Sequence, residues 1–309
     1  MGLDTNALNL LGFAKNQGAD FRRTLSVGRA AVSMREADVA AFLRLFGRPD
    51  LAGSVQRLMQ SKYYEEILSE VFGATEQAAI DASRYEGASI IHDMNRPLDS
   101  AQRFTAILDF GCLEHVFNFP VAIHNLIGLC EADGHILHYL PANNCCGHGF
   151  YQFSPELFFS LYSADRGFSG TRVFFVEWQD DPSVWFEIRS PAEMRRRVLV
   201  ANHYEGYLLV ITKRLATAVS PLDQPPQQSD YVETWKSALA GGVERQPGPA
   251  VTTAMLRPLK QSIKALVAAV GLESQRRRLA LRLNFRKTHV RGRRDDVVPV
   301  RVRDLFGRP

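Results

Sequence analysis

The feature that most constrains this chain is a repeated alternation of short apolar runs with longer segments of helical periodicity. The runs lie at residues 24–28, 78–81, 88–93, 104–109, 135–140, 172–178 and 207–213. Several of them end in a glycine or an acid. Strands that alternate with helices in this way are typical of an α/β fold with a largely parallel sheet. We therefore expect a doubly wound, mostly parallel, seven-stranded sheet.

Helix signals fill the gaps between these runs. Ser33 and Glu36 have the spacing of a capping box, and apolar residues follow at helical spacing. Further helices are expected over 54–71 and over 119–130. Ser154, followed by a proline, has the features of an N-cap with proline in the first turn. The chain is thus expected to open as strand, helix, helix.

The charge distribution divides the chain into an acidic body and a basic C-terminal segment. From Arg257 onward, 15 lysines and arginines stand against 4 acids, although the net charge of the whole chain is only +4. Such an asymmetry indicates a segment with a role of its own. We expect a domain at 1–214, a linker with one short helix at 215–251, and a basic, helical extension at 252–309.

Two roles of the basic extension stay open. Its apolar positions over 257–294 can pack on the sheet domain or on a second subunit, with the arginines in solvent. A basic amphipathic helix can also lie on an anionic membrane surface. No nucleic-acid motif accompanies the charge, so nucleic acid is not an expected partner.

Cysteine usage and targeting signals favour a cytoplasmic location, with peripheral contact to a membrane as an option. Four cysteines in 309 residues are too few for a disulfide framework. No apolar run approaches the ~20 residues that span a bilayer, and residues 1–20 lack a secretory signal. Cys145 and Cys146 precede His148, but this spacing matches no usual zinc pattern. We therefore expect no metal site.

Acidic side chains end several of the expected strands. Asp81, Asp93 and Asp109 each close an apolar run, and Glu114 with His115 follows the last of them. In open α/β sheets, ligands bind beyond the carboxyl ends of the strands, where the winding reverses. Acids at strand ends are also common as helix caps and turn formers, so a structural role is the alternative for each of them.

Two segments resemble class I S-adenosylmethionine-dependent methyltransferases. Residues 104–118 read FTAILDFGCLEHVFN, and the L-E-H-V run is the most specific part of the resemblance. Residues 141–159, PANNCCGHGFYQFSPELFF, resemble the segment after strand five in methyltransferase-like proteins of glycan and polysaccharide biosynthesis. The resemblance covers roughly residues 20–214. It implies a Rossmann-like methyltransferase fold and S-adenosylmethionine as the cofactor.

The resemblance also implies roles for the strand-end residues. Asp81 would hold the ribose of the cofactor, and Asp93 with Met94 would flank the adenine. Val27 and Gly28 would let the backbone approach the methionine portion. The residues that would line the open side of the cofactor are Asp109, Phe110, Gly111 and Glu114.

The polar and aromatic segment 143–153 is expected to bind the methyl acceptor, with a lid of packed aromatic side chains as the alternative. His148, Tyr151 and Gln152 can bind a hydroxylated molecule, and His148 or His115 can accept its proton. The candidate catalytic residues are therefore His115, His148 and Tyr151. The expected acceptor is a hydroxylated small molecule or a glycan precursor.

One departure from the family pattern leaves a second function open. The glycine loop after the first strand is reduced to residues 25–30, where Arg29 and Ala30 replace small residues. Glycines in that loop permit close backbone approach to the cofactor. The alternative is therefore a methyltransferase-like binding or scaffold protein that has lost catalysis. A nucleic-acid methyltransferase is a third class, supported only by the basic extension.

Overall fold

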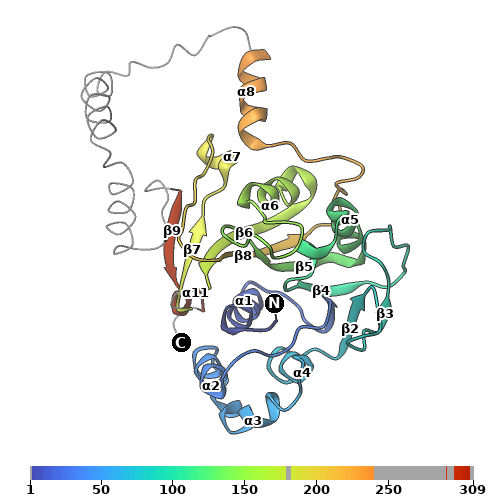
Figure 1. Ribbon diagram of the computed structural model, residues 1–309, viewed down its shortest axis with the longest axis vertical. Coiled ribbons are helices and arrows are strands. Elements are labelled where there is room, and N and C mark those ends of the chain that lie inside the picture. Colours follow the sequence, from blue (N-terminus) through green and yellow to red (C-terminus); the bar gives the residue numbers. More distant parts are fainter. Residues whose placement is uncertain (1, 179–181, 240–289, 291–295, 307–309) are drawn as a thin grey trace, which may run out of the picture.

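The computed structural model describes residues 2–178, 182–239, 290 and 296–306. Its centre is one sheet with the strand order β3-β2-β1-β4-β5-β8-β6-β7-β9 (Figure 1). Seven of these strands overlap the seven apolar runs. The strands are β1 (Arg23–Val27), β2 (Glu76–Asp81), β3 (Ile90–Ile91), β4 (Phe104–Asp109), β5 (Cys130–Pro141), β6 (Phe168–Glu177), β7 (Val184–Ile188), β8 (Gly206–Arg214) and β9 (Val297–Arg301).

The first five strands are parallel and follow the order β3-β2-β1-β4-β5. Doubly wound sheets that bind dinucleotides begin with this order. The chain moves outward from β1 through β2 to β3, and then returns to place β4 on the other side of β1. The winding therefore reverses between β1 and β4, which is the place where such sheets bind ligands.

The other half of the sheet is antiparallel. β8 lies between β5 and β6 and runs against both, β7 runs against β6, and β9 runs against β7. The predicted α/β class is confirmed, but the prediction of a seven-stranded, mostly parallel sheet is wrong: over the described residues the sheet is mixed and has nine strands. Strand β9 lies within the basic extension and contains Pro299, which an edge strand tolerates because its outer N–H groups need no partner.

Helices cover both faces of the sheet (Figure 1). Leu108 and Leu137 face the core beneath the N-terminal helices, whereas their neighbours Ile107 and Ile136 face the core beneath α5 and α6. A strand that is buried on both faces has a continuous apolar sequence, and this explains the apolar runs in β4 and β5. On one face lie α1 (Thr5–Asn16), α2 (Glu36–Leu45), α3 (Val55–Leu58) and α4 (Glu65–Phe72), and on the other lie α5 (Phe119–Leu129) and α6 (Pro155–Leu161).

Helix α1 precedes the first strand, so the expected opening of strand, helix, helix is wrong. Asp4 caps the helix, because its Oδ1 accepts from the Ala7 N–H at 2.8 Å. Its Oδ2 accepts from the Tyr139 hydroxyl at 2.9 Å, and Asn6 Oδ1 accepts from Trp185 Nε1 at 3.0 Å. Two polar side chains of α1 thus bond to the sheet, and polar residues on its buried side obscure the helical pattern.

The helices after β1 also differ in detail from the prediction. The capping box of α2 is formed by Arg35 and Asp38, whose Oδ2 accepts from the Arg35 N–H at 3.2 Å, and Ser33 is not the cap. The single helix expected over 54–71 is divided into α3 and α4. Tyr63, between α3 and α4, pairs instead with the extended segment after β1. The short helices outside the site are η1 (Pro49–Ser54), η3 (Ala164–Arg166) and α7 (Pro191–Met194).

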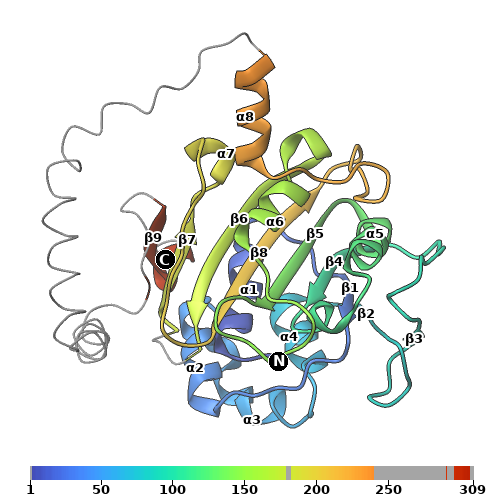
Figure 2. The ribbon, with the colours of Figure 1, turned by 45° about the horizontal axis from the view of Figure 1, so that its top comes forward.

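The described end of the chain closes the far edge of the sheet. β9 pairs with β7, with Val297 opposite Ile188, and is followed by α11 (Val302–Leu305) (Figure 2). Phe306 then packs edge-on against Phe42 of α2, with ring centres 6.0 Å apart. Part of the segment 252–309 therefore belongs to the sheet domain.

Two further predictions concern the linker and the basic extension. The short helix expected in the linker is α8 (Ser229–Leu239). The helices expected over 257–294 lie outside the described residues, apart from Val290. Among the helices that the structure describes, none is both long enough and apolar enough to cross a membrane.

Candidate functional site

The reversal of winding between β1 and β4 places the candidate site. The register pairs Val27 with both Ile80 and Asp109, and it pairs Asp109 with His138. Strands β1, β2, β4 and β5 therefore end at one edge of the sheet. The segments that follow these strands meet beyond this edge, although Val27 itself is buried in the core.

Gly28 turns the chain directly after β1. Its φ is +70°, a region that residues with a Cβ rarely adopt, and its N–H donates to the carbonyl of Ile80 at 2.8 Å. A Cβ built on Gly28 would lie 3.7 Å from Sγ of Cys112, which is an ordinary contact distance. The structure thus brings the backbone after β1 next to the turn after β4.

Three acidic residues lie close enough to Cys112 to affect its thiol. Burial raises the pKa of its thiol, and the nearby carboxyl groups of Asp109, Glu114 and Asp81 raise it further. These acids come from the ends of two strands and from the turn after β4. The structure therefore places Asp81, Asp109 and Glu114 near Cys112, whereas Asp93 lies in the exposed turn after β3.

The acids after β2 and β3 make local contacts. Asp81 is half-buried, and its Oδ1 accepts from the Ser83 N–H at 2.9 Å. Asp93 is exposed, and its Oδ1 accepts from the N–H and Nδ2 of Asn95 at 2.9 and 2.8 Å. Met94 is buried, with Sδ 3.8 Å from Nδ2 of Asn125 on α5. Met94 therefore fills the core, and Asp93 closes its own turn.

Asp109 belongs to a closed, buried network. Its Oδ1 accepts from the N–H groups of Cys112 and Leu113, each at 3.2 Å, and its Oδ2 lies 2.7 Å from Nδ1 of His138. Nε2 of His138 lies 2.8 Å from the hydroxyl of Tyr162. Both oxygens of Asp109 are engaged within the protein, so this residue holds the turn after β4 in place.

Phe110 and Gly111 redirect the chain after β4. Phe110 is buried in the core beneath the N-terminal helices, and Gly111 adopts a φ of +87°. A residue with a Cβ would be strained there. The chain then forms one 3₁₀ turn, η2 (Leu113–His115). This turn places Glu114 and His115 beside the edge of the sheet.

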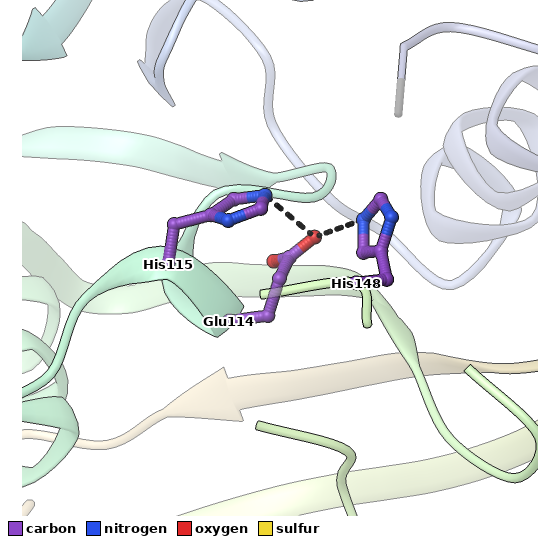
Figure 3. A group of neighbouring side chains, drawn as sticks. All are labelled: Glu114, His115 and His148. Carbon is purple, nitrogen blue, oxygen red and sulfur yellow. Dashed lines mark hydrogen bonds and ion pairs between the residues drawn. The ribbon is translucent and has the colours of Figure 1, made fainter. Parts of the chain in front are cut away.

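Glu114, His115 and His148 form a compact group (Figure 3). Oε1 of Glu114 lies 3.3 Å from Nε2 of His148 and 3.7 Å from Nε2 of His115. The side chain of Glu114 is completely buried, whereas the rings of His148 and His115 are 38% and 52% exposed. The structure therefore brings two candidate catalytic residues together around a buried carboxyl group.

The environment of this group changes its protonation. Burial, and to a smaller extent Asp109, raises the pKa of Glu114 to about 8. Burial and the neighbouring His148 lower the pKa of His115 below its usual 6.5. At neutral pH the carboxyl group therefore keeps its proton and the His115 ring is neutral. A neutral, half-exposed imidazole can accept a proton from a bound hydroxyl group.

Backbone contacts hold the segment after β5 against this group. The N–H groups of Phe150 and Tyr151 donate to the carbonyl of Glu114 at 2.7 and 3.3 Å. A Cβ on Gly149 would lie 2.7 Å from the same carbonyl, so the approach requires glycine. The hydroxyl of Tyr151 donates to the carbonyl of Phe117 at 2.5 Å. This bond engages Tyr151 with the backbone and favours a positioning role for it.

Arg29 stands where the glycine loop of the family would continue. Its Nε donates to Oε1 of Glu65 at 2.7 Å, and its Nη1 donates to the carbonyl of Glu86 at 2.7 Å. The guanidinium also lies 3.9 Å from the ring centre of Tyr63. Residues 29–35 are not helical, and Ala31 within them pairs with Tyr63.

Two pockets adjoin the segments that follow β1 and β5, and neither is lined by Glu114, His115 or His148. One of about 160 Å³ borders Ser26 and Arg29, between β1, β2 and α4. The other, of about 560 Å³, lies beyond β5 and borders Asn143, Asn144 and Gln152. Small-molecule sites usually have volumes of about 300–1,000 Å³. The volume of the larger pocket therefore suits a small molecule, and the amides of Asn143 and Asn144 at its border donate to backbone carbonyls.

Sequence reasoning missed how these side chains pair. It placed Glu114 with a cofactor, whereas the structure places it between two histidines. The available signal was the Glu–His pair in one turn together with a glycine directly after His148. It also missed His138 and Tyr162, whose link to Asp109 depends on strand pairing.

No protein-family model matches this chain, and no curated protein matches it significantly in sequence. Among solved structures, the chain is similar to the N-methyltransferase NodS from Bradyrhizobium japonicum WM9 in complex with S-adenosylhomocysteine. The two are 14% identical, the match covers 69% of this chain and 85% of that chain, and the TM-score is 0.34.

Two further solved structures are similar at the same level. The 1,6-didemethyltoxoflavin-N1-methyltransferase from Burkholderia thailandensis, with bound S-adenosylhomocysteine, is 15% identical over 68% of this chain and 79% of that chain, with a TM-score of 0.33. The [4+2]-cyclase SpnF is 14% identical over 68% and 80%, with a TM-score of 0.36. All three structures are less than 25% identical to this chain, and all three TM-scores are below 0.5.

Proposed function

We propose that this protein is an S-adenosylmethionine-dependent methyltransferase that acts on a hydroxylated small molecule. The single observation that carries the proposal is the convergence at the reversal of winding. Gly28, Asp81 and the turn from Gly111 to Glu114 meet there, around Cys112. In open α/β sheets this crevice is the usual place for an adenosine-containing ligand.

The residues at this edge fit the cofactor in part. Gly28 turns the chain at a positive φ, with Cys112 at ordinary contact distance, and Asp81 stands at the end of β2, where an acid can bind ribose hydroxyl groups. Arg29 is the residue that fits least, because it is tied to Glu65 and Glu86 beside Gly28. The methionine portion would therefore have to contact the backbone from Gly28 onward, with no glycine-rich loop around it.

The cofactor supplies an electrophilic methyl group, and the chain supplies positioning and a proton acceptor. Methyl transfer is an in-line displacement in which correct placement of the two reactants accounts for much of the rate. The neutral ring of His115, or His148 beside it, accepts the proton of the acceptor hydroxyl. Tyr151 holds the segment that carries His148.

The larger pocket provides the place for the acceptor. It is lined by the amide side chains of Asn143, Asn144 and Gln152, which flank His148 in sequence. The Nδ2 atoms of Asn143 and Asn144 already donate to backbone carbonyls, and both amide atoms of Gln152 bond to Cys145 and Cys146. The amide oxygens of the two asparagines are therefore the groups that would accept hydrogen bonds from an acceptor's hydroxyl groups. A sugar or glycan precursor is an acceptor of this chemistry.

The second candidate function is a binding or scaffold protein without catalysis. The observation that favours it is the set of Arg29 contacts, which tie together the segments after β1 and β2. A side chain held in this way can exclude the cofactor from the space beside Gly28. The two functions therefore differ in one measurable property, which is cofactor binding.

Calorimetric titration with S-adenosylmethionine and S-adenosylhomocysteine separates the two functions. We expect micromolar binding by the wild type and a loss of affinity of about 10–100-fold in Asp81→Ala, because hydrogen bonds to charged groups contribute about 1.5–3 kcal/mol. Glu76→Ala is the matched control, since Glu76 lies at the opposite end of the same strand. A folded wild type that binds neither compound would favour the scaffold function.

A further inference from the structure

We propose that Glu114, His115 and His148 bind a divalent transition-metal ion of the Zn²⁺ type. Two imidazole nitrogens and one carboxylate oxygen are a common ligand set of catalytic zinc sites. The three residues are brought together from η2 and from the segment after β5, 33 residues apart in sequence. Neither cysteine of the Cys145–Cys146 pair belongs to this group.

The distances suit one shared ion. The three ligand atoms all lie within 4.8 Å of one another, and Figure 3 shows both rings turned toward the carboxyl group. Bonds of about 2.0–2.1 Å in a tetrahedron place ligand atoms about 3.3 Å apart. Oε1 of Glu114 and Nε2 of His148 are 3.3 Å apart, and the 3.7 Å to His115 shortens with a small rotation of its half-exposed ring.

A second observation concerns the carboxyl group itself. Oε2 of Glu114 is buried and has no hydrogen-bond partner among the described residues. Buried polar atoms without a partner are rare in folded proteins and call for an explanation. The histidines face Oε1 and not Oε2. An ion bound by both oxygens of the carboxylate would give Oε2 a partner as well.

The surroundings hold the ligands and leave the ion accessible. The amides of Phe150 and Tyr151 bind the carbonyl of Glu114, which ties the two ligand-bearing segments together. The rings of His115 and His148 are half exposed, so the remaining coordination positions would face solvent. Three protein ligands with an open position are characteristic of a catalytic zinc site and not of a structural one.

The metal site does not depend on methyl transfer, because an ion can be bound without cofactor or acceptor. If both proposals hold, the open position of the ion would bind the acceptor oxygen and lower the pKa of its hydroxyl group. His115 and His148 would then act as ligands, and the ion would replace the imidazole as the group that promotes loss of the proton.

The test is calorimetric titration of the full chain with ZnCl₂, after dialysis against a chelator and without a histidine tag. We expect one ion per chain, and visible absorption bands of a tetrahedral site when Co²⁺ replaces Zn²⁺. His148→Ala and His115→Ala should each weaken Zn²⁺ binding more than about 100-fold, because loss of a residue that only orients a ligand already costs about 10–100-fold. The matched control is His124→Ala, because His124 bonds to Ser220 and is not a ligand.

Several outcomes would overturn the metal site. A wild type with a folded circular dichroism spectrum that takes up no Zn²⁺ would do so, as would His148→Ala protein that binds as tightly as the wild type. An equal loss in His124→Ala would indicate unspecific binding to histidines. Mg²⁺ prefers all-oxygen ligands, so equal affinity for Mg²⁺ and Zn²⁺ would also contradict the site. The two ligand histidines are half exposed, so their variants should fold, and Glu114→Gln serves as a third test.

Discussion

Two carboxyl–imidazole groups lie close together at the end of β4, and they differ in how completely their polar atoms are satisfied. In the closed network, Asp109 bonds to His138 and to two backbone amides, and His138 bonds in turn to Tyr162. In the open group, one oxygen of Glu114 faces both His115 and His148, and the other has no partner among the described residues.

The difference separates structure from function at this edge of the sheet. A buried network with every partner present stabilises one conformation and leaves nothing for a ligand to bind. A buried carboxyl group beside two half-exposed rings still has capacity for a proton, an ion or a hydroxyl group. Asp109 and Glu114 are five residues apart, yet we assign the first to the fold and the second to the site.

The largest effect should come from the closed network. Asp109→Ala leaves His138 and the amides of Cys112 and Leu113 without their acceptor. We expect the free energy of unfolding to fall by about 3–5 kcal/mol, as when one partner of a buried pair is removed. Urea denaturation measures this loss. A loss no larger than about 0.5 kcal/mol, as at ordinary surface positions, would remove the distinction between the two groups.

The open group should give a pH dependence of stability in metal-free protein. The pKa of Glu114 is about 8 in the folded state, against an ordinary value of 4.5. Folding favours the protonated form of Glu114. Its contribution to the free energy of unfolding is therefore complete below pH 4.5 and is lost as the pH rises through 8.

The Glu114→Gln variant removes this titration. As the pH rises from 5 to 9, the free energy of unfolding of the variant should rise by about 1–3 kcal/mol relative to that of the wild type. The reason is that the variant no longer buries an ionised group without a partner. Urea denaturation at both pH values, with a chelator present, checks the difference. Parallel pH profiles for the two proteins would show that Glu114 is not buried as described.

A smaller effect is expected at the far end of the closed network. Tyr162→Phe removes only the hydroxyl that lies 2.8 Å from Nε2 of His138 and keeps the buried ring. The expected loss is about 0.5–1.5 kcal/mol, the net contribution of one hydrogen bond. The measurement is thermal unfolding of this variant, compared with that of Phe158→Leu, which changes the packing around His138. The comparison separates the contribution of the hydrogen bond from that of ring packing.

The smallest effect on stability is expected at Arg29, which directly follows Gly28 after the end of β1. Its ion pair with Glu65 is partly exposed, so Arg29→Ala should change the free energy of unfolding by less than about 1 kcal/mol. Removal of this side chain should also tighten binding of S-adenosylhomocysteine, because it frees space beside Gly28. Weaker binding by more than about tenfold in calorimetry would identify Arg29 as a ligand for the cofactor carboxylate.

The sequence predicted the parts of the fold that depend on local patterns. β4 coincides with the run 104–109, and Ser154 caps α6 by accepting from the Glu156 N–H at 3.3 Å. Local patterns do not report on long-range pairing, which explains the misses. β9 becomes a strand only because β7 lies beside it, and α1 is held by bonds from Tyr139 and Trp185.

The candidate site could be predicted as a set of residues but not as an arrangement. Gly28, Asp81 and Glu114 could be named as candidates because acids and glycines at strand ends are visible in the sequence, and their roles in cofactor binding stay predictions. The function of Asp109 depends on His138 across the strand pair, and the position of His148 depends on the approach of Gly149 to Glu114. Both contacts arise from tertiary structure, and spacing alone could not separate the structural acid from the functional one.

The position of β9 has a consequence for how the molecule is made. β7 ends at Ile188 and its partner β9 begins at Val297, so more than 100 residues are synthesised between the two edges of this pair. During that interval β7 presents an uncovered edge to the ribosome and to other nascent chains. Phe42 packs against Phe306, so its side of the core is also incomplete until Phe306 has been synthesised. We therefore expect chaperone dependence in the newly made protein until the segment 297–306 has emerged.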